Sequence, residues 1–163
     1  MMKKQIILKW FRRPLRLIPA CFKNARMGEA FSIGKTVEFT DSCRYKLPDK
    51  DRLSWNRLFG VSRGDSGCFA WRYDIQSGMI EIGIDTRISR DRDISFVKRV
   101  PINKKLDFRI SRRNNYLEYY INGVLIGDSW IGYGPEFLWG LGLRFGSTRR
   151  APHAIVIEQE DYC

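Results

Sequence analysis

Two carboxylates four residues apart are the first residues in this sequence that could do chemistry. They are Glu81 and Asp85 in the stretch Glu81-Ile-Gly-Ile-Asp85, and a carboxylate pair can serve as acid and base on a glycosidic bond. Four residues along a β-strand span about 13 Å, whereas glycosidases hold the two carboxyl groups about 5–9.5 Å apart. We therefore interpret Glu81 and Asp85 as a solvated strand face opposite Ile80, Ile82 and Ile84.

The sequence predicts neither a metal site nor a cofactor. Asp91 and Asp93 have the spacing of a calcium loop, but Arg90 and Arg92 interleave them, and cations beside a calcium ion are unfavourable. His153 is the single histidine, which excludes multi-histidine metal sites and catalysis by a histidine pair. No glycine-rich loop has the spacing of a phosphate-binding motif. We therefore expect metal removal to change neither stability nor binding.

The four cysteines are too scattered for a zinc or redox motif. Cys21, Cys43, Cys68 and Cys163 form no Cys-x-x-Cys pair. We expect free thiols, with Cys43 and Cys68 buried as small hydrophobic residues. The even number leaves two disulfides open as an alternative.

The positive charge is concentrated at the N-terminus. The 163 residues carry a formal charge of +11, whereas residues 1–28 contain no acidic residue, and all 14 glycines lie at or beyond Gly28. We therefore predict a basic arm over residues 1–28 and a folded domain over residues 29–163. The basic residues of the arm are Lys3, Lys4, Lys9, Arg12, Arg13, Arg16, Lys23 and Arg26.

A basic arm commonly contacts phosphate, an anionic surface or an acidic protein. We expect a protein partner in a larger assembly, with nucleic acid contacted only through the arm, because the other residues show no basic stripe with interleaved aromatics. The apolar run Ile6-Ile7-Leu8 ends at Lys9 and is too short for an export signal. No run approaches the roughly 18 apolar residues of a membrane span. The expected location is cytoplasmic or virion-associated.

Alternation of apolar and polar residues predicts β-strands almost throughout the domain. Val37 and Phe39, for example, alternate with polar neighbours, and no long helical periodicity occurs. We expect the residues at the inward positions to form the core. They are Val37, Phe39, Phe69, Trp71, Leu106, Phe108, Ile110, Leu141 and Leu143. The predicted strands cover Thr36–Tyr45, Gly67–Asp74, Gly78–Thr86, Lys105–Ser111, Tyr116–Ile121, Val124–Gly127, Phe137–Phe145 and Ala154–Gln159.

Turn residues separate these strands at short intervals. Asn122-Gly123 is a strong hairpin signal, and Asn114-Asn115 and Ser77-Gly78 join further strands. About nine to eleven short strands with one apolar face each predict an all-β fold, in which two antiparallel sheets pack face to face as a sandwich.

The segment 106–127 has a distinctive form: an alternating strand, a turn, a second such strand ending in Asn122-Gly123, and a short apolar strand. It resembles the central hairpins of the concanavalin A-like jelly rolls, the superfamily of lectins, laminin-G domains and glucanases. The segment 141–157 is similar to the closing strands of such domains. Together with 51–73, the chain resembles small sandwich proteins of gut bacteria and their phages over about residues 36–160. Because this fold hosts lectins, hydrolases, lyases and virion proteins, the resemblance implies the fold more than the function.

The enzymes of this superfamily imply two catalytic patterns. Glucanases use Glu-x-Asp-x-x-Glu, but Gly83 stands in place of the middle acid. Jelly-roll polysaccharide lyases use a tyrosine or histidine base and an arginine, glutamine or asparagine that neutralises the uronate carboxylate. The sequence has these residue types, but not the Gln-x-His strand. The candidates are Tyr119, Tyr120, Arg72, Arg109, Arg144 and His153.

Sugar binding by aromatic stacking is the function that we favour from the sequence. Tyr116, Glu118 and Tyr120 share one strand face, which resembles a glycan platform but also a protein interface. The predicted ligand-binding residues are Tyr116, Glu118, Tyr120, Arg72, Arg144, Trp130 and Tyr133. We therefore expect a non-catalytic glycan-binding or adhesion module. The alternatives are a structural component of a phage particle or another assembly tethered by the arm, and a polysaccharide lyase or hydrolase.

Overall fold

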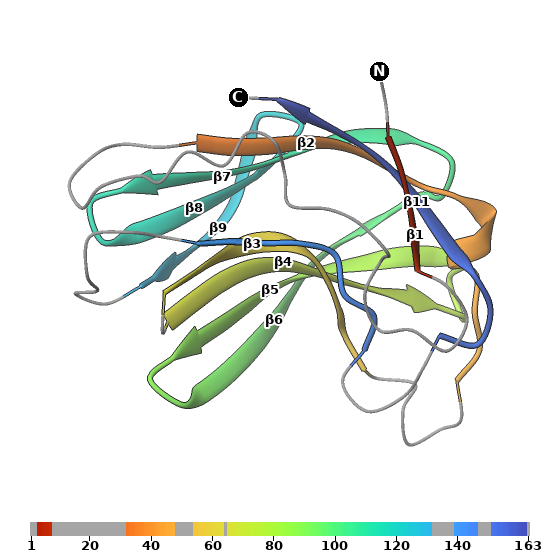
Figure 1. Cartoon of the computed structure of the whole chain (residues 1–163), viewed down its shortest axis with the longest axis horizontal. Coiled ribbons are helices and arrows are strands. Elements are labelled where there is room, and N and C mark those ends of the chain that lie inside the picture. Colours follow the sequence, from red (N-terminus) through yellow and green to blue (C-terminus); the bar gives the residue numbers. More distant parts are fainter. Residues whose placement is uncertain are drawn as a thin grey trace.

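Two antiparallel β-sheets packed face to face make up the described part of the protein (Figure 1). The computed structural model describes residues 3–7, 32–47, 54–63, 65–131, 139–146 and 151–162. This part contains eleven strands and one short 3-10 turn. The predicted all-β sandwich is therefore confirmed.

The first sheet has six strands in the order β1-β11-β2-β7-β8-β9. Their bounds are Lys3–Ile7 (β1), Ile155–Tyr162 (β11), Ser32–Phe39 (β2), Lys105–Arg113 (β7), Tyr116–Ile121 (β8) and Val124–Trp130 (β9). The second sheet has five strands in the order β10-β3-β4-β5-β6. Their bounds are Trp139–Leu141 (β10), Asn56–Arg63 (β3), Asp65–Asp74 (β4), Met79–Ile88 (β5) and Asp91–Val100 (β6).

Aromatic rings from both sheets interlock in the core. Phe69 of β4 packs edge-on against Phe108 and Tyr119 of the opposite sheet, with ring centroids 5.0 and 5.3 Å apart. Phe39 of β2 packs against Trp71 of β4 at 5.4 Å. Edge-to-face pairs are favoured over a face-to-face sandwich of two rings. Because these residues alternate along their strands, the next residue in each strand points to the outer face of its sheet.

The predicted hairpins are present. Asn122 and Gly123 have φ angles of 49° and 77° and join β8 to β9, as expected of a two-residue turn that needs two positive φ angles. Asn114, with φ of 54°, joins β7 to β8. The amide oxygen of Asn122 also accepts a hydrogen bond from the Asp107 backbone at 2.9 Å. Turn chemistry therefore sets the register of these three strands.

Two predicted strands are shorter than expected, and two strands of the five-stranded sheet were missed. The strand predicted to reach Tyr45 ends at Phe39, because Thr40 and Ser42 bind the Val156 carbonyl and turn the chain into the 3-10 turn Asp41–Cys43. In the segment 137–145, only Trp139–Leu141 is a strand, while positions 137 and 138 lie outside the described residues. β3 and β6 were not predicted. β6 is an edge strand with charged residues on both faces, which hides its alternation.

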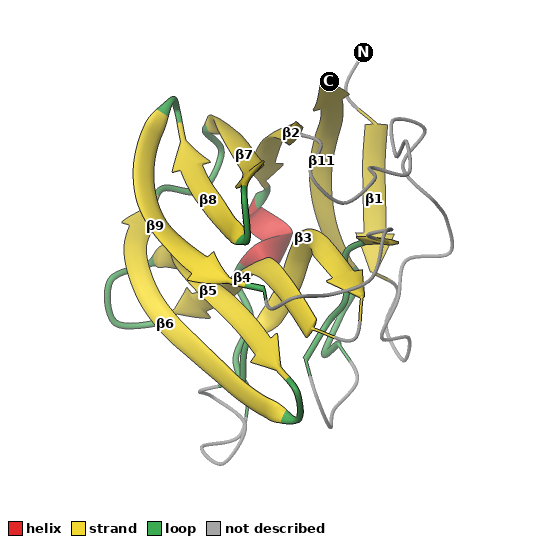
Figure 2. Cartoon of the chain, turned by 90° about the vertical axis from the view of Figure 1, so that its left-hand side faces the viewer, coloured by secondary structure: helices red, strands yellow, loops and turns green. Residues whose placement is uncertain are grey.

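Part of the predicted arm is a strand of the six-stranded sheet. β1 pairs antiparallel with β11, with Lys3 opposite Gln159 and Ile7 opposite Ile155, and the two strands lie side by side in Figure 2. The other basic residues of the arm lie outside the described residues. Within the described part, no helix is long and apolar enough to cross a membrane.

Candidate functional site

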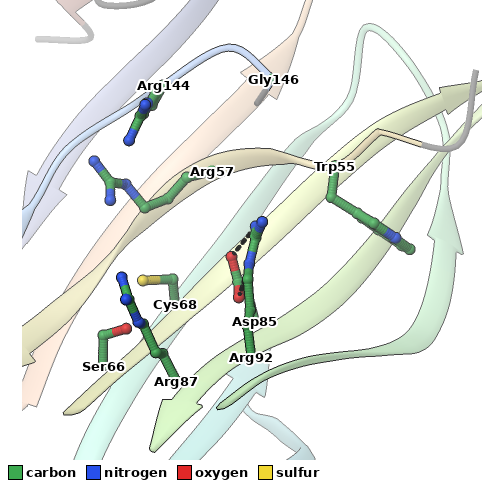
Figure 3. Close-up of a pocket in the computed structure, with 9 residues that line it drawn as sticks. All are labelled: Trp55, Arg57, Ser66, Cys68, Asp85, Arg87, Arg92, Arg144 and Gly146. Carbon is green, nitrogen blue, oxygen red and sulfur yellow. Dashed lines mark hydrogen bonds and ion pairs between the residues drawn. The ribbon is translucent and has the colours of Figure 1, made fainter. Parts of the chain in front are cut away.

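A cavity of about 260 Å³ opens on the outer face of the five-stranded sheet. Its lining comes from β3, β4, β5, β6, the loop before β3 and the segment 142–146 (Figure 3). We call it the arginine cavity, and its described lining residues are Trp55, Arg57, Ser66, Cys68, Asp85, Arg87, Arg92, Arg144 and Gly146.

Strand register brings these residues together. On β4, Phe69 and Trp71 point into the core, so Cys68 and its alternate neighbours point outward. Cys68 lies opposite Asp85 of β5, and Ser66 lies opposite Arg87. Arg57 is joined to Arg144 through two backbone hydrogen bonds of 2.9 Å. Residues far apart in the sequence therefore reach one cavity through ordinary sheet pairing.

The base of the cavity is formed by a small side chain. Cys68 is buried, and a Cβ atom built at the neighbouring Gly60 would lie 2.6 Å from its sulfur. Burial raises the pKa of the Cys68 thiol to about 12, so this group is neutral and protonated at neutral pH. The predicted burial of Cys43 and Cys68 as free thiols is confirmed, and Cys21 and Cys163 lie outside the described residues.

The lining is strongly basic, with four guanidinium groups and one carboxylate among its described residues. Arg92 donates to both oxygens of Asp85 at 2.9 and 2.6 Å, which raises the pKa of Arg92. Arg57 donates through Nε to the Gly142 carbonyl at 2.9 Å. Within the part that the structure describes, neither Arg87 nor Arg144 forms an ion pair. Such a concentration of guanidinium groups is suited to carboxylate or other oxyanions.

Trp55 lines the cavity beside β5. A Cβ atom at Gly83 would lie 3.1 Å from the indole ring and 2.9 Å from the Ser95 carbonyl, so this ring position requires glycine. The Arg72 guanidinium lies 4.3 Å from the ring centroid on its face, a favourable cation–π contact. Gly83, which breaks the glucanase pattern, is therefore explained by the packing of Trp55.

Glu81 is buried, and the interpretation of it as a solvated residue is wrong. Its carboxylate accepts from Arg72 at 2.6 Å and from Arg99 at 2.8 Å, and only 6% of the residue is exposed. Arg99 also lies 3.3 Å from Asp74. Glu81 therefore pairs with Arg72 and Arg99, whereas Asp85 pairs with Arg92, although the two carboxylates share a face of β5 as expected. Four residues apart on β5, the two positions are about 13 Å from each other, too far for the carboxylate pair of a glycosidase.

The predicted ligand-binding residues fall on two different sheets. Tyr116, Glu118 and Tyr120 lie on β8, with Tyr116 opposite Trp130 of β9. Arg72 and Arg144 lie on the outer face of the five-stranded sheet, and Arg144 lines the arginine cavity. Tyr133 lies outside the described residues. The structure therefore does not bring the six described residues of this set into one site.

The outer face of β7–β9 around Tyr116, Glu118 and Tyr120, here called the aromatic face, has its own contacts. The Tyr120 hydroxyl donates to Glu118 at 2.7 Å, which raises the pKa of Tyr120. The Arg109 guanidinium lies 4.2 Å from the Tyr120 ring centroid. These side chains mainly bind one another across the sheet surface.

Other candidate bases lie away from the cavity. Tyr119 is in the core and hydrogen-bonds to Ser129 at 3.0 Å, and burial raises the pKa of its hydroxyl. His153 hydrogen-bonds through Nε2 to the Ser42 carbonyl at 2.7 Å. The described residues contain no cluster of three or more His, Cys, Asp or Glu residues suited to a metal.

Sequence reasoning missed most of the cavity. Ser66, Arg87 and the outward positions of β3 were not singled out, and Arg92 was considered only as a residue that disfavours a calcium site. Alternation contained a usable signal on β4 and β5, because the residues between Phe69, Trp71, Ile82 and Ile84 must face outward. Which strands are neighbours could not be deduced from that pattern.

Comparison with known proteins shows the fold. No protein-family profile matches the chain, and no curated protein matches it in sequence. Among solved structures, alginate lyase AlyC3 matches with a TM-score of 0.61 and 14% identity, over 86% of this chain and 67% of that one. A functionally unknown protein from Saccharomyces cerevisiae matches with a TM-score of 0.61 and 12% identity, over 86% and 72%. Alginate lyase A1-II', of polysaccharide lyase family 7, gives 0.58 and 6%, over 86% and 64%.

These lyases have the concanavalin A-like jelly-roll fold, so the predicted architecture is confirmed. The chain spans about two thirds of the length of the two lyases. The resemblance to proteins of gut bacteria and phages stays a prediction.

The matches contradict the prediction that the protein is not an enzyme. Several matching structures are alginate lyases, and one is AlyC3 in complex with dimannuronate. The prediction relied on the absence of a lyase motif from the sequence. At 6–14% identity, a shared sheet geometry persists although sequence motifs have diverged, so their absence was weak evidence.

Proposed function

We propose that this protein is a polysaccharide lyase that acts on a uronate-containing polysaccharide in the arginine cavity. The observation that carries the proposal is the convergence of Arg57, Arg87, Arg92 and Arg144 on one cavity beside Trp55. Charged carboxylates are recognised by guanidinium groups, and sugar rings by aromatic side chains. The alginate lyases with a similar fold give the reaction class.

The reaction is a β-elimination. A base removes the proton at C5 of the uronate, the electron pair of that bond forms the C4–C5 double bond, and the C4–O bond breaks. The leaving oxygen takes a proton from water. Neutralising the uronate carboxylate makes the C5 proton more acidic, and we assign this role to Arg57 and Arg144, which are held side by side by their backbone pairing.

Asp85 is the proton acceptor that we assign to this reaction. It is the one carboxylate among the described lining residues, and Arg92 fixes its orientation. Cys68 cannot take this role at neutral pH, because its thiol stays protonated. A positioned general base contributes about 10²–10⁴-fold to a rate.

The test is an elimination assay with polymannuronate, polyguluronate and polygalacturonate, followed by the near-ultraviolet absorbance of the unsaturated product. We expect Asp85→Asn to lower the rate at least about a hundredfold. Asp93→Asn is the matched control, because Asp93 is an exposed residue on β6 outside the lining and this variant loses the same charge.

Binding is measured in parallel by electrophoresis through gels containing each polysaccharide. Arg144→Gln should weaken binding, whereas Arg113→Gln, with its side chain 81% exposed on the opposite sheet, should not. Elimination that survives in Asp85→Asn would overturn the assignment of the base. No elimination with any uronate polymer would overturn the lyase proposal.

A further inference from the structure

Arg144 reaches the arginine cavity from a segment whose neighbouring side chains are packed into the core. In the segment 142–146, Leu143 and Phe145 are buried, and the Phe145 ring packs edge-on against Tyr45 with 5.4 Å between centroids. Because side chains alternate along an extended chain, Arg144 points outward, toward the other cavity residues in Figure 3. The position of its guanidinium group therefore depends on how this short segment is held against β3.

Two consecutive residues of β3 hold the segment at three points. The backbone of Arg57 exchanges two hydrogen bonds of 2.9 Å with the backbone of Arg144. The Nε atom of Arg57 also donates to the Gly142 carbonyl at 2.9 Å. At the other end of the segment, the side chain of Asn56 accepts a hydrogen bond through Oδ1 from the Gly146 N–H at 2.6 Å. Asn56 is not among the described lining residues, so it influences the cavity only through the segment.

Asn56 is a buried polar residue whose amide has a fixed orientation. Only 1% of the residue is exposed, and its Nδ2 donates to the Tyr45 hydroxyl at 2.7 Å. The Gly146 N–H can only donate, so it must face the amide oxygen, and the amide nitrogen must face Tyr45. A buried amide is unfavourable without partners, but both ends of this one are bonded. The amide therefore links Tyr45 in the core to the backbone at Gly146.

The bond to Gly146 supports the segment directly after Arg144. The bridge between Arg57 and Arg144 is isolated, so it is not continued as a ladder of strand hydrogen bonds. Two residues later the chain turns at Gly146, whose φ of 24° lies in the left-handed region that favours glycine. Asn56 binds the N–H at this turn. Loss of that bond would therefore loosen the segment on one side of Arg144.

We propose that Asn56 is a positioning residue of the lyase, whose amide holds Gly146 and thereby places the Arg144 guanidinium group for the uronate carboxylate. This inference rests on the proposed function and adds a residue to it. Tyr45 orients the amide and so acts through Asn56. A misplacement of about 1 Å can lower the rate of an enzyme about a hundredfold, so the support of a substrate-binding arginine affects the reaction.

The test is a double-mutant cycle between Asn56→Ala and Arg144→Gln. The measured quantity is kcat/KM for elimination, with whichever of polymannuronate, polyguluronate and polygalacturonate the wild-type protein cleaves. Asn56→Ala should lower kcat/KM about tenfold, because a charge-assisted hydrogen bond to the substrate is weakened. In the Arg144→Gln background, the same substitution should change kcat/KM by less than about twofold, because the side chain that it positions is gone.

Ser129→Ala is the matched control. Ser129 is also buried and polar, and its hydroxyl hydrogen-bonds to Tyr119 at 3.0 Å on the six-stranded sheet. Its effect on kcat/KM should be the same with and without Arg144→Gln. Amide hydrogen exchange gives a second readout that does not depend on activity. The Gly146 amide should exchange at least about tenfold faster in Asn56→Ala, as expected for a lost hydrogen bond, and at the wild-type rate in Ser129→Ala.

Tyr45→Phe is a second variant, which keeps the inference testable if Asn56→Ala does not fold. It retains the ring that packs on Phe145 and removes only the hydroxyl that accepts from Asn56. We expect it to lower kcat/KM about threefold, and to have no effect in the Arg144→Gln background. Tyr119→Phe is its control, because it removes another buried tyrosine hydroxyl.

The outcomes separate this inference from the proposed function. Losses that multiply in the double variants would overturn the role of Asn56, because they would show that it affects stability independently of Arg144. A kcat/KM unchanged in both Asn56→Ala and Tyr45→Phe would overturn it as well, and either result leaves the proposed function intact. A wild-type protein that cleaves none of the three polymers would contradict the proposed function and, with it, this inference.

Discussion

The outer faces of the two sheets are both charged and aromatic, yet they differ in how their side chains are held. On the five-stranded sheet, arginines surround a cavity, and Glu81 is buried between two guanidinium groups. On the six-stranded sheet, Tyr116 and Trp130 are 49% and 37% exposed. Residues of the aromatic face contact one another along the sheet, whereas those of the arginine cavity converge on one hollow in the surface.

This difference shows that residue types alone do not define a site. Tyr116, Glu118 and Tyr120 have the composition of a glycan platform, but they lie on the surface of a sheet. The cavity residues include few aromatics, but backbone register directs several guanidinium groups to a shared space. Convergence and burial give a binding site its selectivity, because they limit which ligand shapes can satisfy all donors.

The largest expected effect concerns the buried ion pairs. Glu81→Gln leaves Arg72 and Arg99 without their shared carboxylate, and we expect the free energy of unfolding to fall by about 2–3 kcal/mol. Glu118→Gln, on the aromatic face, should lower it by no more than about 1 kcal/mol. Urea unfolding measures both values. Equal losses would show that the two faces are held in the same way.

The second effect concerns the packing of Trp55 against Gly83. Gly83→Ala places a methyl group against the indole ring and the Ser95 carbonyl, and should destabilise the protein by about 1–2 kcal/mol. Gly142→Ala is the control, because its added methyl group meets nothing within 4 Å. Thermal unfolding compares the two variants. A stable Gly83→Ala protein would contradict the close packing described for Trp55.

A smaller effect is expected on ligand affinity, which should fall for a variant in the arginine cavity but not for variants on the aromatic face. Trp55→Ala should weaken binding of an acidic oligosaccharide about fivefold to tenfold, as expected for the loss of an aromatic contact. Trp130→Ala and Tyr120→Ala should each change it by less than about twofold. Calorimetric titration gives all three affinities. A greater loss in either aromatic-face variant would move the binding site to β8 and β9.

The smallest effect is a titration on the aromatic face. The Tyr120 hydroxyl donates to Glu118, and this hydrogen bond stabilises the protonated phenol and raises its pKa. The stability that this bond contributes is present below the pKa of an ordinary phenol and is lost as pH rises through the raised value. Glu118→Gln should lower the pKa of Tyr120, as seen in its ultraviolet titration. An unchanged pKa would mean that the bond is absent in solution.

Strands were predicted well where one face is buried and the other exposed. Tyr116–Ile121 was predicted with the bounds of β8, because Leu117, Tyr119 and Ile121 face the core and alternate with polar neighbours. β6 was missed because both sides of an edge strand meet solvent, so its residues show no such alternation.

The site was harder to predict than the fold. Arg72 and Arg144 were chosen from the sequence, but they were grouped with β8 residues that lie on the other sheet. Grouping the right residues requires knowledge of strand order, and the pairing of Arg57 with Arg144 joins segments far apart in the chain. Local patterns determine which way a side chain points, whereas long-range pairing determines which side chains meet.

The position of β11 has a consequence for how the chain folds during synthesis. This strand lies between β1 and β2 and is hydrogen-bonded to both, although the ribosome makes it after all ten other strands in the described part. Until β11 is made, the edges of β1 and β2 that pair with it lack their strand partner. Because such distant pairing slows folding, we expect the six-stranded sheet to close only after β11 has left the ribosomal tunnel, while the hairpins of β4–β6 can form earlier.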